Sequence, residues 1–170
     1  MQEDRIINRV ALSSLISFDL EKLHEPGERI TIDIKDQLYE GIILKEKSFR
    51  EFIKETDWST YQNKFVAITC SADAIVPTWA FMLLAGAVQP FASKVFFGST
   101  EEMESALFKE KLDSLNWDEY QNAKVVIKGC SKVNVPVSAY VEVIKHLKPV
   151  ASSIMYGEPC STVPLFKRPR

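Results

Sequence analysis

The hydrophobic pattern of the chain changes near residue 64. Before it, residues 29–34 alternate apolar and polar side chains, which predicts a strand with one buried face, and residues 45–58 follow the spacing of an amphipathic helix. After it, short unbroken apolar runs alternate with longer helical segments, as in parallel sheets whose strands are buried on both faces. The sequence therefore predicts an α/β fold. A parallel sheet with helices on both faces is expected in residues 64–170, after an N-terminal α+β appendage in residues 1–63.

Helix start signals place the elements of the second region. Pro77 suits the first turn of a helix, and Ser99 or Thr100, followed by acidic residues, suits the start of another. Residues 158–170 contain three prolines and are expected to wrap the surface. The strands predicted here are 65–69, 95–97, 125–127 and 154–156, and the helices are 77–89, 100–115 and 137–147. The appendage is expected to contain a short helix within residues 1–17 and a further strand at 38–44.

A sequence motif recurs within residues 64–170. Lys64–Ser71 and Lys124–Ser131 both read as a strand that ends in Cys-Ser, and each precedes a proline, a helical run, a second proline and a glycine. In both copies the second proline lies 13 residues after the first, and the glycine lies 21 residues after it. These matches predict that residues 64–98 and 124–157 are two βαβ pseudo-repeats.

The three cysteines of the chain follow predicted strands. Cys70 and Cys130 come directly after the first and third strands, and Cys160 lies three residues beyond Gly157, at the exit of the fourth. Ligands of open parallel sheets bind at the carboxyl ends of the strands, where a helix N-terminus also stabilises a thiolate. The placement predicts a three-cysteine metal site at the carboxyl edge of the sheet, with Cys70, Cys130 and Cys160 as ligands and Asp73 beside them.

Three thiolates suit a soft cation, so the expected cofactor is an iron–sulfur cluster or zinc. Zinc would need a fourth ligand, which Asp73 or Glu158 could supply, whereas His146 falls late in its helix and better fits a surface position. Three serines follow the cysteines and would donate hydrogen bonds to the cofactor or cap neighbouring turns: Ser71, Ser131 and Ser161.

Two other interpretations of the cysteines stay open. Three thiols without a metal would suit a thiol-based sulfur or redox transfer protein. Cysteine also packs as a small buried hydrophobe, which would leave a non-catalytic partner protein with buried structural cysteines. The sequence assigns no catalytic residue, and it contains neither Gly-x-Gly-x-x-Gly nor a Walker loop that would indicate a dinucleotide or nucleotide site.

Composition narrows the class of protein further. The chain has 170 residues, 46% of them hydrophobic, and its net charge of −2 gives no reason to expect nucleic acid or an anionic membrane as a partner. It shows neither a signal-peptide pattern nor an apolar stretch long enough to span a membrane, so a cytoplasmic location is expected. The apolar residues of the N-terminal strands fit a homodimer interface as well as a core.

Three segments resemble an uncharacterised bacterial family called domain of unknown function 2480. They are Leu44–Phe52, Cys70–Ala80 and Ser153–Pro164, and the resemblance covers nearly the whole chain. It implies a small soluble cytoplasmic protein and brings neither a reaction nor catalytic residues. Relatives tend to be encoded near iron–sulfur assembly genes, which points to iron–sulfur assembly or sulfur-transfer proteins as partners.

Overall fold

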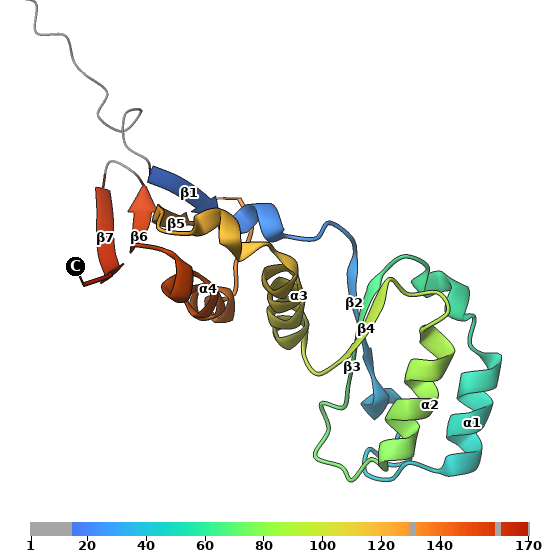
Figure 1. The fold of residues 1–170 in the computed structure, drawn as a ribbon. Coiled ribbons are helices and arrows are strands. Elements are labelled where there is room, and N and C mark those ends of the chain that lie inside the picture. Colours follow the sequence, from blue (N-terminus) through green and yellow to red (C-terminus); the bar gives the residue numbers. More distant parts are fainter. Residues whose placement is uncertain (1–14, 130–131, 159–160, 170) are drawn as a thin grey trace, which may run out of the picture. The chain divides into compact units, whose positions relative to one another are not determined.

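The computed structural model describes residues 15–129, 132–158 and 161–169, in which helices and strands alternate (Figure 1). The predicted α/β class is confirmed, and the strands pair mostly in parallel. The strands are β1 Leu15–Asp19, β2 Arg29–Asp33, β3 Phe65–Thr69, β4 Lys94–Phe97, β5 Lys124–Lys128, β6 Ser153–Glu158 and β7 Ser161–Lys167. The α-helices are α1 Glu46–Glu55, α2 Thr78–Val88, α3 Thr100–Ser114 and α4 Val137–Val150. Short 3-10 helices are η1 Leu20–Leu23, η2 Ile34–Gln37, η3 Trp58–Tyr61 and η4 Trp117–Tyr120.

The described strands form two sheets rather than one. β2, β3 and β4 make a parallel sheet in that order, and β1, β5, β6 and β7 make a second sheet that is parallel except for β7. The chain divides accordingly into two compact units. We call Glu25–Glu104 the inserted unit, and the residues up to His24 and from Ser105 onward the outer unit.

The predicted N-terminal appendage supplies a strand to each sheet. β1 pairs with β5 and β2 pairs with β3, both in parallel. The boundary predicted between residues 63 and 64 falls between η3 and β3, within the inserted unit. The helix expected in residues 1–17 lies mostly outside the described residues, and its last three positions belong to β1.

The strand predicted at residues 38–44 does not form. Ile43 makes isolated bridges with Tyr39 and Ile75, but neither bridge extends into a strand. Glu40 and Gly41, in the middle of this segment, have φ values of 51° and 72°, so the chain reverses in a left-handed turn there. A hydrophobic run interrupted by such a turn cannot continue as a strand.

The C-terminal segment forms β7 instead of wrapping the surface. Pro164 is compatible with this strand because β7 is the outermost strand of its sheet, where a missing N–H leaves no bond unmade. Beyond β7, the Arg168 guanidinium donates to the carbonyls of Pro149 and Val150 at 2.9 and 3.1 Å. These bonds satisfy the C-terminal carbonyls of α4, which extends three residues beyond its predicted end.

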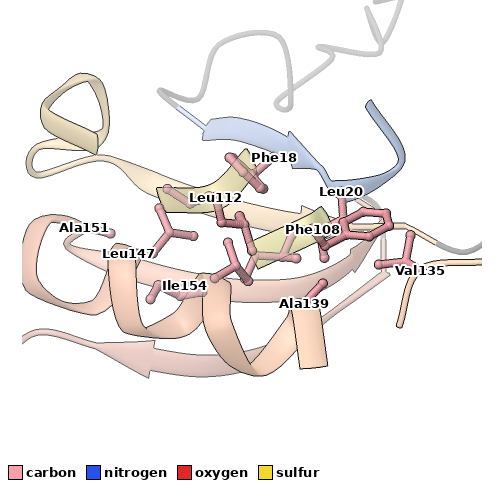
Figure 2. Close-up of a cluster of buried hydrophobic side chains, with 12 residues drawn as sticks. Phe18, Leu20, Phe108, Leu112, Val135, Ala139, Leu147, Ala151 and Ile154 are labelled. Atoms are coloured by element: carbon pink, nitrogen blue, oxygen red, sulfur yellow. The ribbon is translucent and has the colours of Figure 1, made fainter. Parts of the chain in front are cut away.

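The core of the outer unit gathers side chains from its sheet, α3 and α4 (Figure 2). On α4, Ala139, Val143 and Leu147 follow at four-residue intervals and are buried, as expected of a helix face turned to a sheet. Burying one leucine or isoleucine contributes roughly 1.5–3 kcal/mol through its removal from water. The other buried members of this core are Phe18, Leu20, Phe108, Leu112, Val125, Ile127, Val135, Ala151 and Ile154.

The inserted unit has a separate core. On α2, Ala80, Leu84 and Val88 follow at the same four-residue intervals and are fully buried. The remaining buried members are Ile32, Ile34, Leu44, Phe49, Trp58, Val66 and Ile68. Each of the two cores consists of residues from one unit only.

The two units repeat the same strand register. Phe65 begins β3 and Lys124, 59 positions later, begins β5. Phe65 pairs with the first residues of β2 and β4, and Lys124 pairs with the first residues of β1 and β6. The predicted repeat therefore extends beyond the two βαβ segments and includes the strand that precedes each of them.

Hydrogen bonds outside the strands follow the same repeat. The indole N–H groups of Trp58 and Trp117 each donate to the carbonyl five residues earlier, at 2.8 and 3.0 Å. Asn63 and Asn122 take left-handed φ values of 61° and 58°, which asparagine tolerates better than most residues. Each donates its backbone N–H to the carbonyl 28 residues later, at 3.0 and 2.8 Å. These positions therefore specify the shared backbone.

The paths of the two units separate after a repeated glycine. Gly98 and Gly157 have φ values of 125° and 121°, a region that side chains rarely enter. In the inserted unit, Ser99 and Glu102 then exchange backbone N–H to side-chain bonds at 2.7 and 3.2 Å, and this capping box starts α3. In the outer unit, the chain continues through Glu158 and pairs with β6 again as β7.

Candidate functional site

Cys70 is the described cysteine of the predicted thiol site, and it directly follows β3 as predicted. It is half-buried, packs against the core of the inserted unit, and donates its thiol hydrogen to the carbonyl of Ala72 at 3.8 Å. The two carboxylates proposed as further ligands, Asp73 in the same loop and Glu158 at the end of β6, are both exposed. The predicted site residues Cys130, Ser131 and Cys160 lie outside the described residues.

The sheet topology changes the basis of the thiol hypothesis. β3, which precedes Cys70, belongs to the sheet of the inserted unit, whereas β5 and β6 belong to that of the outer unit. The expectation that the three strand exits share one sheet edge is therefore wrong. Hydrophobic patterns indicate that a strand is buried, but they do not indicate which strands pair. The three-cysteine site stays a prediction that the described residues do not support.

The repeat also shows that Cys70 and Cys130 are not equivalent positions. Counted from the first residues of β3 and β5, Cys70 corresponds to Gly129. A Cβ atom at Gly129 would lie 2.7 Å from the hydroxyl of Tyr140 and 3.4 Å from Cβ of Leu20. A cysteine side chain does not fit there unless its neighbours move. The two Cys-Ser pairs are thus shifted by one residue relative to the structural repeat.

Hydrogen bonds from Ser71 connect the loop after β3 to Asp33 at the end of β2. The Asp33 carboxylate accepts the backbone N–H of Ser71 at 3.0 Å and its hydroxyl at 2.6 Å, as well as the N–H of Lys35 at 3.0 Å. Burial acts to raise the pKa of Asp33, but the bonds from Ser71 and Lys35 outweigh it and lower the pKa to about 2. Ser161, the other described serine of the predicted site, is exposed at the start of β7.

The inserted unit has an apolar pocket between α2 and the end of its sheet. The cavity has a volume of about 470 Å³, and among the described residues no charged side chain lines it. Met82 of α2 and Phe97 of β4 lie at its open side, where they are 70% and 75% exposed. Its other lining residues are Ile68, Thr78, Phe81, Ala85, Val95 and Phe96.

The outer unit has a pocket at the equivalent position, beside α4 and β6. Its volume is about 570 Å³. Five of its lining residues stand 59 positions after lining residues of the first pocket: Ile127, Val137, Tyr140, Ile144 and Tyr156. The remaining lining residues are Asn134, Val135 and Leu165.

Each pocket is lined by its own edge-to-face pair of aromatic rings. The rings of Phe81 and Phe97 are 5.2 Å apart at 89°, and those of Tyr140 and Tyr156 are 5.8 Å apart at 85°. This arrangement is a favoured one for two aromatic rings. Because different residues reproduce one geometry, the pocket is a feature of the repeated fold and not a packing defect of one unit.

The two pockets differ on the side of the last parallel strand. In the outer unit, β7 pairs antiparallel with β6, and Leu165 of β7 contributes to the lining. Tyr156 is 38% exposed there, against 75% for the equivalent Phe97 of the inserted unit. β4 is the outermost strand of the described sheet of the inserted unit. The inserted unit therefore has an open sheet edge beside its pocket, whereas in the outer unit β7 covers the equivalent edge and adds Leu165 to the lining of a pocket that stays open.

The lining residues of both pockets are mostly apolar, with a few polar side chains. Among the described residues, neither pocket is lined by a carboxylate, a histidine or a cysteine that could act as a base or a nucleophile. Apolar walls with a few polar groups, at a volume of several hundred Å³, are typical of ligand sites. Sequence reasoning missed these pockets, although the signal was present: aromatic residues recur at positions 81 and 140 and at 97 and 156. Aligning the repeats on their Cys-Ser pairs shifts these positions out of register.

Within the described part of the chain, no helix combines the length and the apolar character needed to cross a membrane. Comparison with curated proteins and with solved structures gives no match. Residues 4–168 match the family described as "Protein of unknown function (DUF2480)". The resemblance noted from the sequence is thereby confirmed, and the chain belongs to the DUF2480 family.

Proposed function

We propose that this protein is a non-catalytic binding protein whose inserted unit captures an extended apolar peptide segment along β4. The peptide would pair antiparallel with β4 and place an apolar side chain in the pocket beside Met82 and Phe97. The observation that carries this proposal is the outer unit, in which β7 pairs with the equivalent edge strand, β6, and Leu165 of β7 lines the equivalent pocket. This internal pairing supports the proposal as a model for the arrangement of the peptide on β4.

The composition of the β4 edge favours such a partner. An outermost strand presents a row of unpaired backbone N–H and C=O groups, which an extended peptide can pair with. Lys94, at the start of β4, forms an ion pair with Glu25 at 3.5 Å. The rest of the strand is Val95-Phe96-Phe97, without a charge that would repel an apolar partner. Exposed methionine and phenylalanine side chains beside this edge are typical of an interaction surface.

β7 indicates which peptide chemistry would fit. It has seven residues, Ser161-Thr-Val-Pro-Leu-Phe-Lys167, and its Val163 lies opposite Tyr156 of β6. We infer a partner segment of similar length, extended and without acidic residues, with an aliphatic side chain where β7 has Leu165. Proline would be accepted, because the partner would itself become an outermost strand.

Binding of a fluorescein-labelled peptide with the β7 sequence to the full chain tests the proposal. Fluorescence anisotropy should rise to saturation with the wild-type protein. Met82→Glu should weaken binding by about tenfold or more, because the substitution brings a carboxylate to an apolar pocket that cannot pair it. Both Met82 and the control position below are exposed, so neither substitution disturbs a core.

Val141→Glu is the matched control. Val141 stands 59 positions after Met82 and is 65% exposed, but it belongs to the unit whose edge β7 already fills. This variant should bind the peptide as the wild-type protein does. Absence of saturable binding, or binding that Met82→Glu leaves unchanged, would contradict the proposal.

The three-cysteine interpretation has its own test. Iron, zinc and acid-labile sulfide are measured in anaerobically purified wild-type protein and in Cys130→Ser. Stoichiometric metal that disappears in the variant would support a site formed by Cys70, Cys130 and Cys160, and wild-type protein without metal would count against it. A fast-reacting thiol in metal-free protein would favour sulfur or redox transfer.

A further inference from the structure

A cluster of potential metal ligands lies on the helices of the outer unit, among residues that the repeat does not explain. Glu142 and His146 are one turn apart on α4, and Asp113 lies at the end of α3. One ligand atom from each of the three lies within 4.8 Å of the other two. Nε2 of His146 is 3.2 Å from an oxygen of Asp113 and 3.8 Å from one of Glu142.

The ring of His146 is held in place by Trp117. The two rings stack with centroids 4.8 Å apart and planes 8° from parallel. The His146 side chain is 22% exposed, but its Nε2 atom is shielded from solvent; among the described residues its contacts are the ion pairs with Asp113 and Glu142, and neither has good hydrogen-bond geometry. Buried polar atoms without a hydrogen-bond partner are uncommon in native proteins and call for an explanation. A cation bound between Nε2 and the two carboxylates would provide one.

Two lysines form ion pairs with the carboxylates of Asp113 and Glu142. Lys145 bonds to Glu142 at 2.7 Å, and Lys109 pairs with Asp113 and lies 3.8 Å from Glu142. Both lysine side chains are more than half exposed, so they can turn to solvent when a cation takes their place.

The inserted unit lacks this cluster although it has the same backbone. The positions 59 residues earlier carry Lys54, Leu83 and Ala87, which cannot form such a site. The tryptophan recurs there as Trp58. The three ligand side chains are therefore not required by the repeated fold, and they distinguish the outer unit.

We propose that Asp113, Glu142 and His146 bind a zinc ion on the outer unit. One imidazole nitrogen and two carboxylate oxygens are a ligand set that zinc accepts, and three protein ligands leave one tetrahedral position for water. The imidazole disfavours magnesium and calcium, which prefer oxygen ligands. This site is independent of strand capture at β4, because the two lie on different units.

Zinc titration of the full chain, followed through the NMR signals of its two histidines, tests the proposal. The signals of His146 should shift and saturate at one equivalent of zinc, and those of His24 should not shift. Cysteine thiolates also bind zinc. The titration is therefore performed on the wild-type chain and on a chain whose three cysteines are replaced by serine, and the His146 response should appear in both.

Variants separate a zinc site from an ion-pair network. His146→Ala and Glu142→Gln should each weaken zinc binding by about tenfold or more, and His24→Ala should bind as the parent chain does. Lys145→Ala should bind zinc at least as tightly as the parent, because it removes a competing cation. Unshifted His146 signals at one equivalent, or zinc affinity unchanged in both ligand variants, would overturn the proposal. Circular dichroism confirms that each variant is folded.

Discussion

The inserted and outer units repeat the same arrangement of strands and turns, and they differ in one additional strand and in the side chains on their helices. The same strand register occurs in both units, and the tryptophan hydrogen bond and the left-handed asparagines recur 59 positions apart. The differences lie after the last parallel strand, where the outer unit adds β7, and on the helix surface, where the outer unit carries its histidine cluster. The comparison separates the positions that specify the fold and its pocket, which are repeated, from β7 and the histidine cluster, which only the outer unit has among the described residues.

The largest expected effects come from two phenylalanines at equivalent core positions. Phe49 and Phe108 stand 59 positions apart, and they are 1% and 2% exposed. Phe49→Ala and Phe108→Ala should each lower the free energy of unfolding by about 3–5 kcal/mol, measured by urea denaturation. Because the two cores share no residue, amide hydrogen exchange should accelerate only in the substituted unit. Acceleration throughout the chain would show that the units are not independent.

Replacing the equivalent glycines Gly98 and Gly157 with alanine should lower the free energy of unfolding by different amounts. A Cβ at Gly98 would meet the flexible end of Glu102 at 2.5 Å, whereas one at Gly157 would meet the backbone carbonyl oxygen of Ser161 in β7 at 2.6 Å. Gly157→Ala should therefore cost about 3 kcal/mol of unfolding free energy and Gly98→Ala about 1–2 kcal/mol. Gly86→Ala, in a helix with open space around it, should stabilise by about 0.5–1 kcal/mol. Equal losses at the first two positions would mean that β7 does not constrain β6.

Substitution of Asp33 should cause a smaller loss of stability. The equivalent residue of the outer unit is Asp19. Asp33→Asn should lower the free energy of unfolding by about 1–2 kcal/mol at pH 7, because it weakens charge-assisted bonds from Ser71 and Lys35. The pKa of Asp33 is lowered to about 2 from its model-peptide value of 3.8. Its contribution is therefore complete above about pH 5 and declines as the pH falls toward 2.

Urea denaturation of the wild-type protein and Asp33→Asn across this pH range checks the expectation. The stability difference between them should be largely lost near pH 2, the pKa of Asp33 in the folded protein. Asp19→Asn changes a cap that accepts the backbone N–H of Glu21 at 3.1 Å, and within the described ranges no hydroxyl donates to it, so this variant should cost less at pH 7. A difference for Asp33→Asn that does not depend on pH would exclude the carboxylate charge as its cause.

Local structure could be read from the sequence to within a few residues. Helices predicted at 77–89 and 100–115 are found at Thr78–Val88 and Thr100–Ser114, because proline, capping residues and hydrophobic spacing act within a few residues of one another. The repeat could also be read, since the residues that fix turns recur in order. Pairing between distant strands could not, because it depends on packing across the whole chain. For that reason two sheets were taken for one.

The candidate sites could be predicted less well than the fold. The sequence drew attention to the cysteines, but Cys70 follows a strand of one sheet and Cys130 and Cys160 follow segments of the other unit. The lining of the outer pocket includes Leu165 of β7, whose proline-containing sequence resembles a surface loop until its partner strand is known. His146 was assigned to the surface because it falls late in its helix, and nothing in the sequence indicated its neighbour Asp113, which is 33 positions away.

Backbone amide hydrogen exchange at β4 and β6, measured with and without the β7-sequence peptide, tests the central claim most directly. In the free protein, amides of β6 should be protected on both sides of the strand, and the amides of β4 that face away from β3 should exchange rapidly. Added peptide should slow exchange in β4 and leave β6 unchanged. If β4 is as protected as β6 in the free protein, or if saturating peptide leaves β4 unprotected, the open edge is not a binding site for an extended peptide.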